Sequence, residues 1–92
     1  MMHVTPPPTV DLLTQELGHL RRHLDRSLPI AARARAFWAG AVLARDYGAA
    51  DQVQADLRNL ARETGLTADL PFGAETVDHL IRSAFRDLNP FG

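Results

Sequence analysis

Three side chains that can bind a metal ion share one face of a predicted helix. Glu16, His19 and His23 are spaced three and four residues apart, which aligns them on one side of a helix. Two histidines at this spacing can bind Zn²⁺, which takes three or four ligands in tetrahedral order. A solvated face flanked by Arg22 and Arg26 explains the same pattern. We therefore expect no metal site and no cofactor, although zinc binding by the two histidines stays open.

Groups for covalent catalysis are scarce. The chain has no cysteine, and its serines are Ser27, where a helix is expected to begin, and Ser83, in the middle of another. No glycine-rich loop precedes a basic residue in the order that phosphate-binding loops use. We expect a protein that is not an enzyme. The lack of cysteine fits a reducing compartment, and a cytoplasmic location is expected.

The charge distribution limits the classes of partner. All ten basic residues are arginine, which fits either codon bias in a GC-rich bacterial genome or guanidinium recognition of anions. Residues 1–50 carry six arginines against four acids, and residues 51–92 carry four against seven. The formal net charge of −1 argues against general nucleic-acid binding, which needs a strong positive field. The uneven halves favour contact with a second copy or with a charged partner.

No segment is expected to enter a membrane. The longest uncharged apolar run, residues 36–44, is too short to cross about 30 Å of hydrocarbon as a helix. The N-terminus has neither the basic nor the apolar region of a secretory signal. We expect a soluble protein without a membrane partner.

The spacing of apolar residues predicts an all-α fold with a single four-helix domain. A flexible, extended proline-rich arm is expected over residues 1–8 and the helical domain over residues 9–92, with helices at about 9–26, 29–47, 50–64 and 74–88. Gly48 and Gly65 are expected to end the second and third helices in the left-handed conformation. Asp51 and Gln54 resemble a capping box at the start of the third. Short loops favour antiparallel neighbours.

The helix expected over residues 29–47 has an unusually apolar surface. Ala36, Gly40 and Ala44 form one line of small side chains, along which a second helix can approach closely. We expect this line to lie on the inner face, flanked by Ile30, Phe37, Ala41, Leu43 and Tyr47.

The opposite face carries Trp38 and Val42 between Arg35 and Arg45. Two hypotheses fit it: other helices of the chain cover it, or it is an exposed anchor for a partner. Tryptophan and arginine are enriched at binding hot spots. We therefore expect a non-catalytic interaction or structural module that binds another protein or itself through these four residues, as an adaptor or assembly subunit. Phe91, next to the last residue, is a second candidate anchor.

The stretch LARETGLT, residues 60–67, resembles the first helix and turn of the helix-turn-helix family. The resemblance implies a DNA-binding regulator built on residues 50–88, in which Ala61 packs against the second helix and Gly65 makes the turn. The chain departs from the family at Pro71, where an apolar residue is expected, and acids on the reading helix would repel phosphate. A small structural component of a phage-like particle is a further alternative, to which no motif points.

Overall fold

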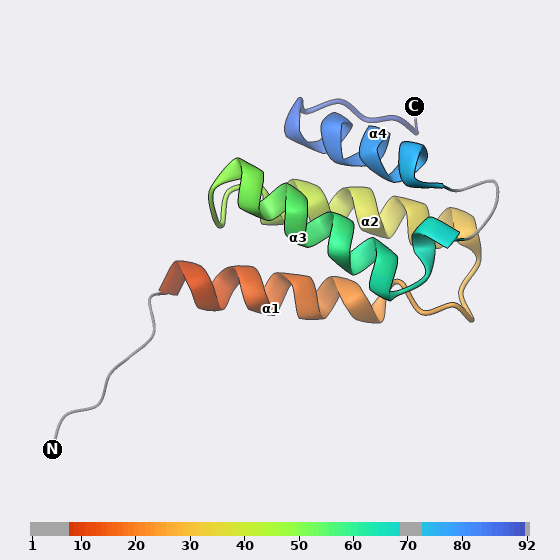
Figure 1. Cartoon of the computed structure of the whole chain (residues 1–92), viewed down its shortest axis with the longest axis horizontal. Coiled ribbons are helices and arrows are strands. Elements are labelled where there is room, and N and C mark those ends of the chain that lie inside the picture. The colour runs from red at the N-terminus through yellow and green to blue at the C-terminus, as the bar shows by residue number, and fades with distance from the viewer. Residues whose placement is uncertain (1–7, 69–72, 92) are drawn as a thin grey trace, which may run out of the picture.

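The computed structural model describes residues 8–68 and 73–91. Over these ranges the chain is helical without strands, as Figure 1 shows, with the elements α1 (Pro8–Arg22), α2 (Ile30–Ala44), α3 (Ala50–Glu63), the short 3-10 helix η1 (Leu66–Ala68) and α4 (Ala74–Phe85). The predicted all-α fold with four helices is confirmed. Of the predicted arm, residues 1–7 lie outside the described residues, and Pro8 already belongs to α1.

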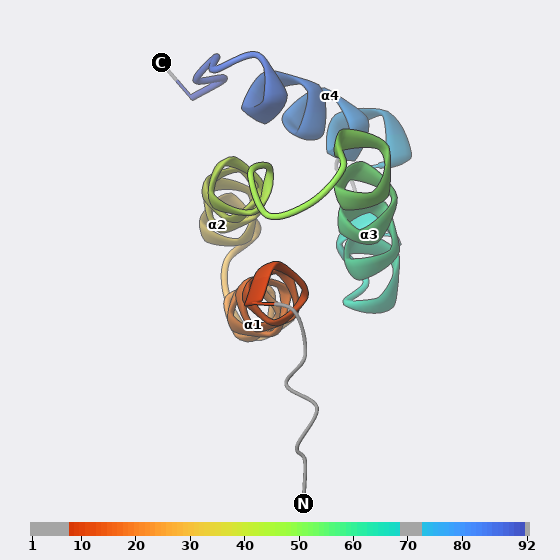
Figure 2. The same ribbon diagram turned by 90° about the vertical axis from the view of Figure 1, so that its left-hand side faces the viewer.

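The four helices surround one core. Figure 2 looks nearly along α1, α2 and α3 and shows α1 and α4 on opposite sides of the α2–α3 pair. α2 packs against α1 on one side and against α4 on the other, and α3 contacts the same two helices. α2 therefore lies between two neighbours, which accounts for much of its apolar surface.

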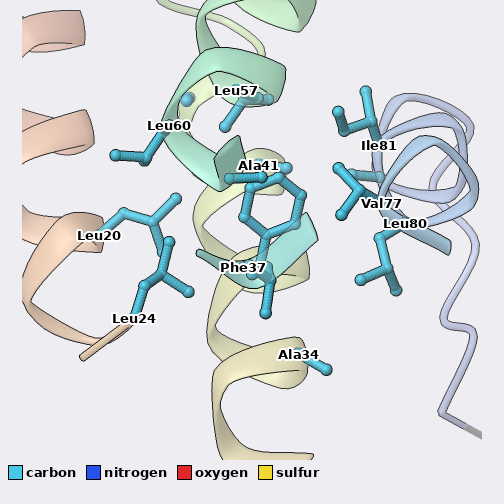
Figure 3. Packing of buried hydrophobic residues seen from close by; sticks show 14 of the residues in the cluster. Leu20, Leu24, Ala34, Phe37, Ala41, Leu57, Leu60, Val77, Leu80 and Ile81 are labelled. Carbon is cyan, nitrogen blue, oxygen red and sulfur yellow. The ribbon is translucent and has the colours of Figure 1, made fainter. Parts of the chain in front are cut away.

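The ring of Phe37, which is fully buried, occupies the centre of the core. Figure 3 shows leucines of α1 on one side of this ring and apolar side chains of α4 on the other. The buried hydrophobic residues of the core are Leu20, Leu24, Ala34, Phe37, Ala41, Ala44, Val53, Leu57, Leu60, Ala61, Leu66, Val77, Leu80, Ile81 and Ala84. Burying a side chain of the size of leucine or phenylalanine stabilises the fold by about 1.5–3 kcal/mol.

α1 and α2 meet closely at Gly40. A Cβ atom added at this glycine would lie 2.6 Å from Cδ2 of Leu20. Of the other two small residues on the predicted line, Ala44 is buried and Ala36 is half-buried. Leu43 was predicted on the inner face, and this is wrong: its side chain is 55% exposed. Because α1 packs on the Gly40 side of α2, Leu43 falls on the solvent side of that contact.

Three helices end earlier than their apolar pattern predicts, at Arg22, Ala44 and Phe85. Gly48 does not end α2 in the left-handed conformation, because the helix has already stopped at Ala44 and the amide of Tyr47 donates to the Ala44 carbonyl at 2.9 Å. Gly65 does adopt this conformation, with φ of 81°, and Leu66 behind it is fully buried.

The predicted capping box is wrong. α3 begins at Ala50 with Ala49 as its N-cap, and no side chain bonds to the first turn. Ser27 was expected at the cap of the second helix, but Pro29 holds that position. The amide of Ser27 instead donates to Oδ1 of Asp25 at 2.8 Å, which closes the turn between α1 and α2.

Candidate interaction surface

The solvent side of α2 has few polar groups. The helix as a whole has two charged residues, both arginines. Arg33 is buried and donates its Nε–H to the carbonyl of Leu28 at 3.1 Å, whereas Arg35 is exposed. Ala39 and Leu43 follow Arg35 on the exposed side. A helix exposed to water normally carries charged and polar side chains there, so this face is a candidate for contact with another molecule.

Trp38 is half-buried. The rest of the chain therefore covers it only in part, whereas the two hypotheses had it either covered by other helices or exposed for a partner. Its indole N–H donates to the carbonyl oxygen of Leu88 at 3.0 Å. Its ring meets the ring of Phe91 edge to face, with 6.2 Å between centroids and an angle of 78° between the planes. The segment that follows α4 therefore covers part of Trp38.

Arg35 also contacts the Phe91 ring. Its guanidinium carbon lies 5.5 Å from the centroid of the Phe91 ring, within range of an attractive cation–π interaction. The amide of Phe91 donates to Oδ1 of Asn89 at 2.9 Å. Phe91 as a whole nevertheless stays 37% exposed. We name the cluster of Arg35, Trp38, Leu88 and Phe91 the Trp38 patch.

Arg45 joins the end of α2 to the end of α4. Its guanidinium donates to the backbone carbonyl of Ala84 and pairs with Asp87 at 2.7 Å. A cation at a helix C-terminus satisfies a carbonyl that has no partner within the helix. Arg45 is thus bonded within the chain, whereas the sequence predicted it at the edge of an exposed partner-binding face.

The turn that brings Leu88 and Phe91 back to α2 begins at Asp87, whose φ is 59°. The amide of Leu88 donates to the carbonyl of Ser83 at 2.8 Å, and the amide of Asp87 reaches the Ala84 carbonyl at 3.4 Å. This is the pattern of a Schellman motif, with aspartate where glycine is usual. The predicted continuation of the helix to Leu88 is therefore wrong, and Leu88 is 55% exposed.

Val42, the remaining residue of the predicted partner face, is half-buried and packs against the core cluster. The structure thus brings Arg35, Trp38 and Phe91 into contact, while Val42 and Arg45 face the domain itself. Sequence reasoning missed Leu88 and Asp87. The last helix was predicted to run to Leu88, and no residue in that stretch predicted the earlier reversal at Asp87.

A second apolar feature lies between α1 and α2. Side chains of both helices line a groove of about 260 Å³: Glu16, His19, Leu20, His23, Ala36, Ala39, Gly40 and Leu43. The rings of His19 and His23 lie edge to face at 5.2 Å. Among the described residues, no group of three or more His, Cys, Asp or Glu side chains has a metal-binding arrangement.

The helices of the helix-turn-helix alternative are α3 and α4. Ala61 is fully buried and Gly65 makes the turn after α3. α4 begins only at Ala74, nine residues after this glycine. The carboxylate of Asp78 in α4 accepts a hydrogen bond from Nε of Arg58 in α3 at 2.8 Å. Arg58 is therefore already paired with a carboxylate of the chain itself.

Comparison with known proteins identifies no relative: no protein family model, curated protein or solved structure matches this chain. In the described parts of the chain, no helix has both the length and the apolar character needed to cross a bilayer.

Proposed function

We propose that this protein is a non-catalytic helical module that binds another protein, or a second copy of itself, through the Trp38 patch. The observation that carries the proposal is the pair of aromatic rings, Trp38 and Phe91, held edge to face and still partly open to solvent. Tryptophan and arginine are enriched among the few residues that dominate binding energy at protein interfaces, and such residues cluster together. Here Arg35 already lies over the Phe91 ring.

The apolar surface around this pair supports the proposal. Leu88, whose carbonyl accepts the indole hydrogen bond, leaves 55% of its own surface in solvent. Contiguous exposed apolar patches with a charged rim mark interaction sites in soluble domains. Arg35 and the Arg45–Asp87 pair supply such a rim.

The proposal is tested by comparing two leucines with the same exposure. Leu88 belongs to the Trp38 patch, and Leu43 lies in the α1–α2 groove; each is 55% exposed. Light scattering over a concentration series, with tryptophan fluorescence recorded alongside, measures association of the wild-type chain and of the variants L88S and L43S. We expect association that L88S weakens and L43S leaves unchanged.

Loss of association in L43S alone would move the interface to the groove and refute the proposal. A wild-type chain that stays monomeric is next tested by photo-crosslinking in its host from a residue placed at Leu88. The proposal requires one defined adduct that disappears in the Trp38→Ala chain. The absence of any adduct would also refute it. Far-UV circular dichroism checks that each variant stays folded.

A further inference from the structure

The segment from Asp87 to Phe91 occupies the outer face of α2 at three points. Asp87 pairs with Arg45, the Leu88 carbonyl accepts from the Trp38 indole, and the Phe91 ring contacts Trp38 and Arg35. Each point uses a different interaction: an ion pair, a hydrogen bond and an aromatic contact. α2 therefore presents a set of groups that recognises a short segment by charge, backbone and ring.

The two sets of groups match in length and run in opposite directions. Arg45 and Arg35 are ten residues apart on the sequence, which is about 15 Å along a helix. Four residue steps from Asp87 to Phe91 span at most about 14 Å. Figure 1 shows the chain after α4 turning back over the bundle, so that Asp87 meets the C-terminal end of α2 and Phe91 meets Arg35.

The contacts with α2 leave much of this segment exposed to solvent. The side chain of Asp87 is 77% exposed, and Leu88 and Phe91 keep 55% and 37% of their surfaces in solvent. Asp87 also adopts a left-handed conformation, which costs L-residues energy although aspartate tolerates it better than most. The carboxylate side of the Arg45–Asp87 pair is open to water, which screens the ion pair and weakens its contribution to stability. The segment can therefore leave α2 without loss of the core, which contains none of its side chains.

We propose that the outer face of α2 is a receptor for a short acidic-aromatic segment of a partner protein, one with a carboxylate followed four residues later by an aromatic ring, and that residues 87–91 occupy this receptor as a built-in competitor. The inference goes beyond the proposed function: in the closed state Leu88 and Phe91 belong to the Trp38 patch, and in the open state the partner segment takes their place on Trp38. A partner segment must displace the chain's own segment, so its apparent affinity is reduced by the fraction of molecules in which the receptor is closed.

The test uses the full chain and a fluorescently labelled heptapeptide with the sequence of residues 86–92, Arg-Asp-Leu-Asn-Pro-Phe-Gly. Fluorescence anisotropy measures its binding to the wild-type chain and to F91A, in which the competing ring is removed. We expect F91A to bind the peptide at least about fivefold more tightly than the wild type, because its own segment closes the receptor less often. A peptide with alanine in place of phenylalanine should bind neither chain.

L43A is the matched control chain, since it loses an exposed apolar side chain away from the segment, and it should bind the peptide as the wild type does. Adding R45Q to F91A should weaken peptide binding, because the carboxylate of the peptide loses its cation. If the wild type and F91A bind the peptide with equal affinity, residues 87–91 do not act as a competitor. If neither chain binds the peptide, the outer face of α2 is not a receptor for such a segment.

Hydrogen exchange of the Trp38 indole N–H with solvent, measured by NMR, is a second test that does not depend on measuring the affinity of the peptide. Exchange should be faster in F91A than in the wild type and should slow when the peptide is added; identical exchange in both chains contradicts the inference. The two proposals fail separately. If association depends on Leu88 but the peptide does not bind, only the proposed receptor is refuted. If the peptide binds but association does not depend on Leu88, only the proposed interface is refuted.

Discussion

Alanine at Gly40 tests the close contact between α1 and α2. The added Cβ would lie 2.6 and 2.7 Å from the two methyl carbons of Leu20 and 3.0 Å from its Cγ. Real Cβ atoms do not approach carbon this closely, so α1 or the leucine must move. Leu20 is 3% exposed and sits among core residues, which leaves its side chain little room to rotate away.

Two opposing effects set the magnitude. Alanine within a helix is favoured over glycine by about 1 kcal/mol. Overpacking of a well-filled core costs about 1–3 kcal/mol. With about 2 kcal/mol for the contact, G40A should lower the free energy of unfolding by about 1 kcal/mol.

Gly18 provides the control, because it lies within α1 and a Cβ there would meet nothing within 4 Å. G18A gains the same helix propensity without the contact and should raise the free energy of unfolding by about 1 kcal/mol. Urea denaturation followed by circular dichroism measures both variants. The gap between them, about 2 kcal/mol, isolates the contact, and each kcal/mol corresponds to a change of about 4–8 °C in Tm.

If G40A stabilises the chain as much as G18A does, α1 and α2 are not in contact at this point and the packing described above is wrong. The double variant G40A/L20A gives an independent check. Its loss in free energy of unfolding should be smaller, by about 1 kcal/mol, than the sum of the losses of the two single variants, because the alanine fills space that the shortened side chain vacates.

Two further predictions concern the turns. G65A should lower the free energy of unfolding by about 1–2 kcal/mol, because Gly65 has a φ of 81° and L-residues resist the left-handed region; an unchanged urea midpoint would contradict this. Hydrogen bonds from the Ser27 hydroxyl and amide hold the pKa of Asp25 below its ordinary value of 3.8. Since the folded-state pKa is the lower one, Asp25 contributes stability at pH above this value and loses it as the pH falls below. S27A should move the Asp25 pKa back up, as an NMR titration of its carboxyl carbon can show, and a pKa unchanged by S27A would exclude the hydroxyl as a cause.

The helices themselves could be predicted from the sequence. Apolar residues at helical spacing placed all four, and the apolar residues at that spacing in α3, Val53, Leu57, Leu60 and Ala61, are all buried. Gly65 marked the end of that helix correctly. Such features are local, because a helical period and a left-handed glycine depend on residues within one or two turns.

The ends of the other helices could not be predicted in this way. Apolar spacing continues to Leu88, yet α4 ends at Phe85. Arg45, 42 residues before Asp87 in the sequence, bonds there to the last turn of α4 and to the aspartate that reverses the chain. A helix end stabilised by a side chain from another helix leaves no signal in its own stretch of sequence.

The sequence by itself determined that α2 would be apolar around most of its circumference and that Trp38 would lie opposite Gly40. Only the tertiary structure decided what covers each side: α1 approaches at Gly40, α4 packs against another side of α2, and Phe91 contacts the indole of Trp38 edge to face. The physical reason is that hydrophobic burial has no direction. It requires apolar surface to be covered, whereas the choice of cover depends on contacts between residues as far apart as Trp38 and Leu88.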